Sequence, residues 1–125
     1  MTFKIAIQWT ETAVKQLRKL PPKVRKGLLG KADELRQCDD PREVHKPLVG
    51  PLAGFYRITY ARYRAIYTVE EVKAQKGKTV LRLRVLFVAA GKREARSRED
   101  VYEVAKKLVQ YGLVEPPSSD DDDKA

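Results

Sequence analysis

The run of residues 55–69 most constrains what this chain can fold into, because it predicts a tight β-hairpin. Aromatic, β-branched and basic side chains alternate through residues 55–60 and again through 63–69. This two-residue period is typical of strands with two chemically different faces. If Ala61 and Arg62 form a two-residue turn, the strands pair antiparallel with Tyr60 opposite Tyr63. A slip of one residue would move every side chain to the other face, so the register decides the chemistry of each face.

With this pairing, the two faces of the hairpin differ in character. The first face carries Arg57, Thr59, Arg64 and Ile66. The second face carries Tyr56, Ile58, Tyr60, Tyr63, Ala65 and Tyr67. The second set is apolar enough to lie beneath helices. We therefore expect the first set to project outward as a cationic, partly open surface.

The other segments predict an α+β fold with the order β-α-α-β-β-β-α. We expect strands at residues 3–9, 55–60, 63–69 and 79–90, a turn at 73–78, and helices at 10–20, 22–37 and 100–111. Thr10 can cap the first helix, and Pro21-Pro22 ends it and opens the second, giving a helical hairpin. The expected arrangement is a single domain with one mostly antiparallel sheet and its helices packed on one face.

The last eight residues differ in composition from the rest of the chain. Four aspartates and Lys124 resemble an enteropeptidase recognition sequence, so residues 118–125 are interpreted as a vector-derived tail, with a natural acidic tail as the alternative. The remaining domain, residues 1–117, carries 25 basic and 13 acidic residues, a net charge of +12. A charge of this size predicts a polyanionic partner, which could be RNA, DNA or a strongly acidic protein.

The sequence also excludes several classes of protein. It contains no apolar stretch long enough to span a membrane and no N-terminal secretory signal, so cytoplasmic residence is the expected default. Cys38 is the only cysteine, which excludes a disulfide framework and a thiolate metal cluster. The only histidine, His45, lies in a polar loop and is expected on the surface. Trp9 is expected in the core.

Three local patterns, in order along the chain, resemble one known family. The first is Lys46-Pro47-Leu48 with Gly50 just before the sheet, and the second is Tyr56-Arg57-Ile58 followed by Tyr63-Arg64-Ala65-Ile66-Tyr67. The third is the apolar run 85–90 with Gly91-Lys92-Arg93, followed by Asp100-Val101-Tyr102. Together with the element order, they resemble the RelE/ParE superfamily of toxins from toxin–antitoxin systems.

The resemblance implies a function and a set of site residues. Toxins of the RelE branch cleave messenger RNA in the ribosomal A site, and matching positions imply a catalytic set of Arg57, Arg64, Arg93 and Tyr102. Thr59 stands where the family often has a second lysine. Contacts to RNA and to the ribosome, near the 16S rRNA of the A site, are expected from Lys46, Arg62, Lys92, Arg96 and Arg98. The resemblance also implies an acidic cognate antitoxin, and neither a metal nor an organic cofactor.

The implied reaction is attack of the RNA 2′-hydroxyl on the adjacent phosphorus. Arginines suit the stabilisation of charge on the phosphorane because they stay protonated and offer a planar fork of donors. Tyr102 could serve as a base or could stack on a nucleobase. Two other functions stay open: a ParE-like poison of DNA gyrase without nuclease chemistry, and a plain nucleic-acid-binding domain.

Overall fold

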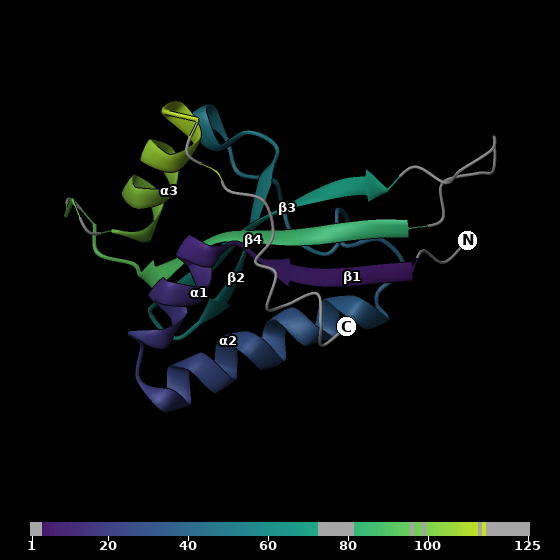
Figure 1. Ribbon diagram of the computed structural model, residues 1–125, viewed down its shortest axis with the longest axis horizontal. Coiled ribbons are helices and arrows are strands. Elements are labelled where there is room, and N and C mark those ends of the chain that lie inside the picture. Colours follow the sequence, from purple (N-terminus) through teal and green to yellow (C-terminus); the bar gives the residue numbers. More distant parts are fainter. Residues whose placement is uncertain (1–3, 73–81, 96, 99, 113, 115–125) are drawn as a thin grey trace.

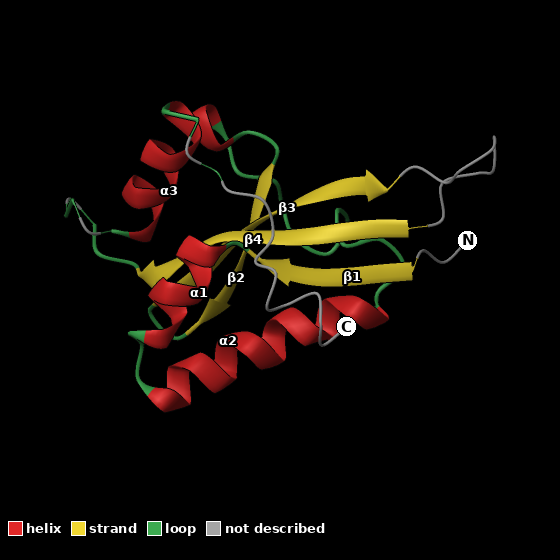
Figure 2. Ribbon diagram, viewed as in Figure 1, coloured by secondary structure: helices red, strands yellow, loops and turns green. Residues whose placement is uncertain are grey.

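Four strands form one sheet, with three α-helices packed on it, in the computed structural model, which describes residues 4–72, 82–95, 97–98, 100–112 and 114 (Figures 1 and 2). The elements are β1 (Lys4–Trp9), α1 (Glu11–Arg18), α2 (Pro22–Glu34), β2 (Phe55–Tyr60), β3 (Tyr63–Val72), β4 (Arg82–Lys92) and α3 (Val101–Gln110), with short 3-10 turns at Leu35–Gln37 and Gly50–Leu52. The strand order is β1-β4-β3-β2. Only the β1–β4 pair is parallel among these strands. The predicted α+β class and element order are confirmed.

Several predicted boundaries shift by a few residues. Strand β3 continues to Val72, beyond the predicted end at residue 69, and β4 continues to Lys92. The second helix is α-helical only to Glu34, and its last three predicted residues form a 3-10 turn. The predicted turn at 73–78, the first three residues of the predicted strand 79–90, and the 118–125 tail all lie outside the described residues.

The hairpin has the predicted register. Arg57 pairs with Ile66, Thr59 with Arg64, and Tyr60 with Tyr63. The turn residue Ala61 adopts a φ of 53°, the left-handed conformation that primed hairpin turns require. The alternation of faces therefore follows the sequence prediction, and Arg57, Thr59 and Arg64 lie on the face opposite the buried Tyr67.

Strand β4 is the central element of the fold because both of its faces are buried. Val85 and Phe87 contribute to one core, whereas Leu86 and Val88 contribute to the other. A bulge interrupts the pairing with β3: Tyr67 pairs with Phe87, but Ile66 pairs with Ala89. The extra residue places Val88 and Ala89 in succession against the same core, and such bulges also increase the local twist of a sheet.

The first core joins the sheet to α1 and α2. Trp9 stacks on Phe87 with ring centroids 4.2 Å apart, and Tyr67 contacts the same ring at 5.2 Å. Aromatic pairs of this kind contribute about 0.5–1.5 kcal/mol beyond the burial of their area. The helices add their apolar stripes, namely Ala13 and Leu17 from α1 and Val24, Leu28 and Ala32 from α2. The expectation that Trp9 is a core residue is confirmed.

The second core corrects one part of the sequence prediction. Val101 and Ala105 of α3 pack with Leu52, Ile66 and Leu86 on the sheet face opposite α1 and α2. Figure 1 shows α3 and α2 on opposite sides of the sheet. The prediction that all helices cover one face is therefore wrong. Ile66, predicted on the open surface, is fully buried within this cluster. The part of that face around Arg57, Thr59 and Arg64 stays open.

Two glycines in α2 have different surroundings. A Cβ added at Gly27 would overlap the ring of Tyr60 on β2, whereas a Cβ added at Gly30 would meet nothing within 4 Å. Gly27 therefore allows α2 to approach the hairpin closely. Gly30 has no such contact and simply lowers the intrinsic helix propensity.

These surroundings predict opposite effects of the same substitution. We expect Gly27→Ala to destabilise the protein by about 1–3 kcal/mol, because the ring of Tyr60 must move. Gly30→Ala serves as the matched control and should stabilise by about 0.5–1 kcal/mol through helix propensity. Urea unfolding at constant pH measures both changes. Equal effects at the two positions would contradict the close packing of α2 on β2.

Candidate functional site

Arg57 and Tyr102 meet on the open face of the sheet although they lie 45 positions apart in the sequence. Arg57 projects from β2, and Tyr102 is the second residue of α3. The guanidinium Nη1 of Arg57 donates to the phenolic oxygen of Tyr102 at 3.1 Å. This contact exists because α3 packs on the same sheet face that carries Arg57. The arrangement brings a cation and a hydroxyl together where a ligand can reach both.

Arg93 completes this cluster from the segment that follows β4. Its guanidinium carbon lies 4.9 Å from the centre of the Tyr102 ring, a cation–π arrangement. Its Nη1 also lies 2.7 Å from Oδ1 of Asp100. The structure therefore brings Arg57, Arg93 and Tyr102 into one group, which we call the arginine–tyrosine cluster.

Asp100 is the buried anchor of this group, with only 1% of its surface exposed. As the N-cap of α3 it accepts from the backbone N–H of Tyr102 at 3.1 Å, and it also accepts from the N–H of Glu94 at 2.6 Å. Burial alone would raise the pKa of the Asp100 carboxyl, but these hydrogen bonds and that of Arg93 hold the pKa below its usual range. The contact with Asp100 in turn raises the pKa of the Arg93 guanidinium.

Arg64 is arranged differently from the other predicted site residues. Its Nη1 donates to the carbonyl oxygens of Ala61 and Tyr63, both at 3.0 Å. The guanidinium thus closes the hairpin turn, and among the described residues its hydrogen bonds go to the turn rather than to the arginine–tyrosine cluster. Its place on the sheet beside Gly91 keeps it on the same face.

The predicted RNA-contacting residues are spread around the cluster. Arg62 and Arg98 are exposed, and the carbonyl oxygen of Arg62 accepts from the backbone N–H of Arg93 at 2.7 Å. Lys92 lies 3.7 Å from Glu94. Arg96 lies outside the described residues. Lys46 lines a pocket beside Arg57.

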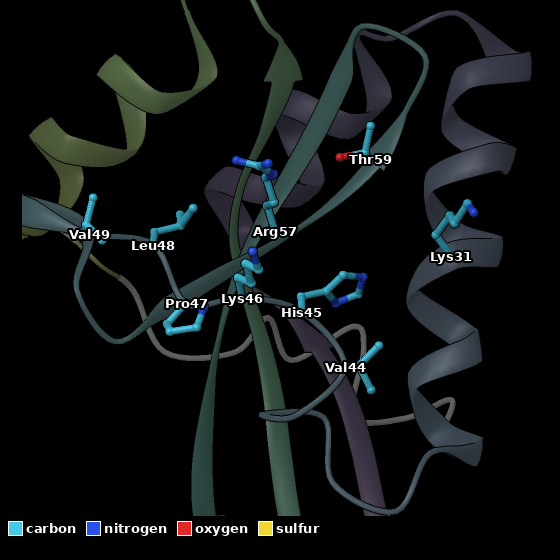
Figure 3. Close-up of a pocket in the computed structure, with 9 residues that line it drawn as sticks. All are labelled: Lys31, Val44, His45, Lys46, Pro47, Leu48, Val49, Arg57 and Thr59. Atoms are coloured by element: carbon cyan, nitrogen blue, oxygen red, sulfur yellow. The ribbon is translucent and has the colours of Figure 1, made fainter.

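This pocket, which we call the β2–α2 pocket, has a volume of about 630 Å³ (Figure 3). Three basic side chains contribute to its wall, from Lys31 of α2, Lys46 of the loop before β2, and Arg57 of β2. The remaining lining residues are Val44, His45, Pro47, Leu48, Val49 and Thr59. None of these described lining residues is a carboxylate, so the pocket favours an anionic ligand.

His45 is a candidate site residue that the sequence prediction missed. It is half-buried in the wall of the pocket rather than on the surface. Its Nδ1 lies 2.9 Å from the phenolic oxygen of Tyr67, which donates to the carbonyl of Pro41 at 3.2 Å. Burial lowers the pKa of the His45 imidazole, and the charges of Arg57 and Lys31 lower it further. The sequence feature that could have pointed to His45 is its position directly before the Lys46-Pro47-Leu48 pattern.

Two classes of feature are absent from the part of the chain that the structure describes. No three or more His, Cys, Asp or Glu side chains there are grouped so that they could hold a metal ion. None of the helices among those residues is both long and apolar enough to cross a membrane.

Comparison with known proteins identifies the family to which the chain belongs. Residues 7–87 match the family described as the ParE toxin of the type II toxin–antitoxin system parDE. The chain belongs to this toxin family. A search of curated protein sequences gave no match.

Solved structures of RelE toxins are also similar to this chain. A mutant of Escherichia coli RelE in the free state is 28% identical, with a TM-score of 0.56, and the match covers 86% of this chain and 99% of that one. The isolated E. coli RelE toxin is 30% identical, with a TM-score of 0.50 and coverage of 83% and 97%. The RelBE2 toxin–antitoxin complex of Mycobacterium tuberculosis is 24% identical, with a TM-score of 0.54 and coverage of 74% and 95%, and supports the fold alone. The predicted RelE/ParE superfamily is confirmed.

The geometry around Asp100 predicts a pH-dependent contribution to stability. Because the carboxyl pKa is lower in the folded protein than its ordinary value of 3.8, the stabilisation is complete well above that value and is lost as the pH falls through the folded pKa. We expect Asp100→Asn to cost about 1–3 kcal/mol at neutral pH, since buried donors lose a charged acceptor. The difference from wild type in urea unfolding should be constant from about pH 7 to 5 and should narrow below about pH 4.

Asp33→Asn is the matched control for this prediction. Asp33 forms an exposed ion pair with Arg36, in which both side chains are at least 45% exposed. Exposed pairs contribute roughly 0–1 kcal/mol, so this variant should behave like wild type. A difference for Asp100→Asn that stays constant to about pH 3 would contradict the assignment of a buried, ionised Asp100.

Proposed function

We propose that this toxin is a ribosome-dependent endonuclease that cleaves messenger RNA in the A site. The observation that carries the proposal is the arginine–tyrosine cluster, which brings Arg57 and Arg93 to within contact of one tyrosine on an open face. The supporting comparison is the likeness to E. coli RelE, which extends over nearly the whole of that toxin. The chemistry is attack of the 2′-hydroxyl on the adjacent phosphorus.

The cluster suits the charge that develops in this reaction. Arg57 and Arg93 can donate to the non-bridging oxygens of the phosphorane, and groups that are held in place before the reaction stabilise such charge strongly. The Arg93–Asp100 pair holds one of these cations in position. The Tyr102 oxygen accepts from Arg57, so the phenolic proton stays available to a substrate oxygen.

Dependence on the ribosome follows from how open the site is. Both Arg57 and Arg93 are exposed, so they can hold a phosphate without fixing the rest of the RNA. A ribosome that presents the mRNA in one orientation would supply the alignment that this face lacks. Lys46, Arg62, Lys92, Arg96 and Arg98 would then contact RNA or ribosome around the cluster, and Arg64 would support it from the hairpin turn.

The family also implies a partner that controls the toxin. The net charge of +12 on residues 1–117 and the carboxylate-free wall of the β2–α2 pocket favour an acidic antitoxin segment. A segment of this kind would cover the cationic face and exclude RNA from it.

A second function has one observation in its favour. The family that matches residues 7–87 is named for ParE, and a ParE-like toxin would act on DNA gyrase without cleaving RNA. That match includes Arg57 but ends before Arg93 and Tyr102, so it does not weigh for or against those two residues of the cluster.

The nuclease proposal predicts the effect of two substitutions on cleavage of a defined mRNA on programmed 70S ribosomes. Arg57→Ala should lower the single-turnover rate by roughly 10²- to 10³-fold, because a donor to the transition state is lost. Tyr102→Phe should lower it by roughly 10²- to 10⁴-fold, because a positioned proton is lost. Primer extension locates the cuts and gives the rates.

Arg18→Ala is the control variant. Arg18 is an exposed arginine at the end of α1, and α1 packs on the opposite face of the sheet. Its removal should leave the rate within about twofold of wild type, since exposed cations far from a site act only through a screened field. If folded wild-type protein makes no cuts, the proposal is wrong, and inhibition of gyrase supercoiling then tests the second function.

A further inference from the structure

The β2–α2 pocket and the arginine–tyrosine cluster share one residue, Arg57. It lines the pocket, and its Nη1 contacts Tyr102. Figure 3 shows the Arg57 side chain extending from β2, and the His45 ring directed toward the helix that carries Lys31, α2. A phosphate held by Arg57 would therefore have Tyr102 on one side and the pocket that contains His45 on the other.

The imidazole of His45 is held in one orientation and one tautomer. The carbonyl of Pro41 can only accept, so the Tyr67 hydroxyl gives its proton to that carbonyl and its oxygen accepts from Nδ1 of His45. Nδ1 therefore carries the proton, and Nε2 is left unprotonated. Tyr67 is fully buried and packs against Phe87 and Tyr56, so this chain of hydrogen bonds is fixed from inside the core.

The groups around the ring keep it neutral. Lys31 faces it from α2, Arg57 from β2, Lys46 from its own loop, and the phenol of Tyr67 from β3. Three of these four groups are cations, and burial raises the pKa of the fourth, Tyr67, so that it stays uncharged. Positive neighbours and partial burial both disfavour imidazolium. At neutral pH the Nε2 lone pair is consequently available to take a proton.

We propose that His45 is the general base of this toxin and takes the proton of the 2′-hydroxyl of an RNA whose phosphate is bound by Arg57. This assignment rests on the proposed nuclease function. The 2′-O–H proton moves to Nε2 as the 2′-oxygen bonds to phosphorus. The bond from phosphorus to the 5′-oxygen breaks, and that oxygen keeps the electron pair and takes the phenolic proton of Tyr102. The products are a 2′,3′-cyclic phosphate and a free 5′-hydroxyl, and exchange with water restores both side chains.

The division of work between the two residues follows from their contacts. Tyr102 accepts a hydrogen bond at its oxygen, so it has a proton to give. His45 donates at Nδ1, so its Nε2 has a lone pair that can accept a proton. Tyr67 is a positioning residue, because it acts on the substrate only through the orientation of His45.

The test is single-turnover cleavage on programmed ribosomes from about pH 5.5 to 8, with wild type and His45→Gln. For wild type, the rate should rise with pH and level off below the ordinary imidazole value of 6.5, because the neutral base is the active form. For His45→Gln, the rate should fall roughly 10²-fold or more, since a positioned base contributes about that much. The rate of this variant should also no longer rise and level off with pH in this range. Ribosome affinity should stay unchanged, because glutamine keeps the size and polarity of the side chain.

Two further variants separate a base from a structural residue. His45→Ala with added imidazole should regain part of its rate, because free imidazole can occupy the space and accept the proton. Tyr67→Phe keeps His45 but removes the hydroxyl that contacts Nδ1. Its rate should therefore fall less than that of His45→Gln, and the rate should still rise with pH and level off. Thermal unfolding of each variant confirms that the fold is intact.

Each outcome decides one of the two proposals. If wild type cleaves and His45→Gln has the same rate and the same pH profile, the assignment of His45 is overturned and the nuclease proposal stands. A loss of ribosome affinity with an unchanged single-turnover rate also overturns the assignment, because His45 then only binds. If folded wild type makes no cuts, the nuclease proposal fails and the base assignment falls with it.

Discussion

The rest of the structure depends on one constraint, the burial of strand β4 on both faces. A strand that alternates Val85 and Phe87 with Leu86 and Val88 exposes apolar side chains in two directions, and each direction needs a cover. Helices α1 and α2 cover one side, and α3 covers the other. Because α3 lies on the side that carries Arg57, its first turn places Tyr102 within hydrogen-bonding distance of that arginine. The site is thus a consequence of how the core is closed.

The buried carboxylate of Asp100 transfers this packing to the side chains that face solvent. It joins the segment after β4 to the start of α3 through Glu94, Tyr102 and Arg93. A buried charge is costly unless it is paired and hydrogen-bonded, so these three contacts with Asp100 have few alternatives. The same carboxylate that caps the helix therefore also orients one of the cations proposed to act on phosphate.

Some features of this structure were predictable from the sequence and others were not. The register of the hairpin followed from a two-residue turn and a strict period, because side-chain parity leaves no intermediate choice. The side on which α3 packs did not follow, since an amphipathic helix shows that one face is buried but not against which surface. The pocket was also hidden, because His45 and Lys31 are 14 positions apart and meet only through the fold of the intervening loop.

The position of His45 connects the hydrophobic core with the proposed chemistry. The ring of Tyr67 packs against Phe87 in the core, and its hydroxyl contacts the imidazole of His45, which lines a cationic pocket. A neutral imidazole beside Lys31, Lys46 and Arg57 is consistent with the repulsion between like charges, because protonation of His45 would add a fourth cation to the pocket wall. In the proposed reaction, the arginines would hold the phosphate and the imidazole would serve as a separate group for proton transfer. Simple binding of nucleic acid or gyrase would call on the cations, whereas the proposed cleavage would call on the cations and the imidazole together.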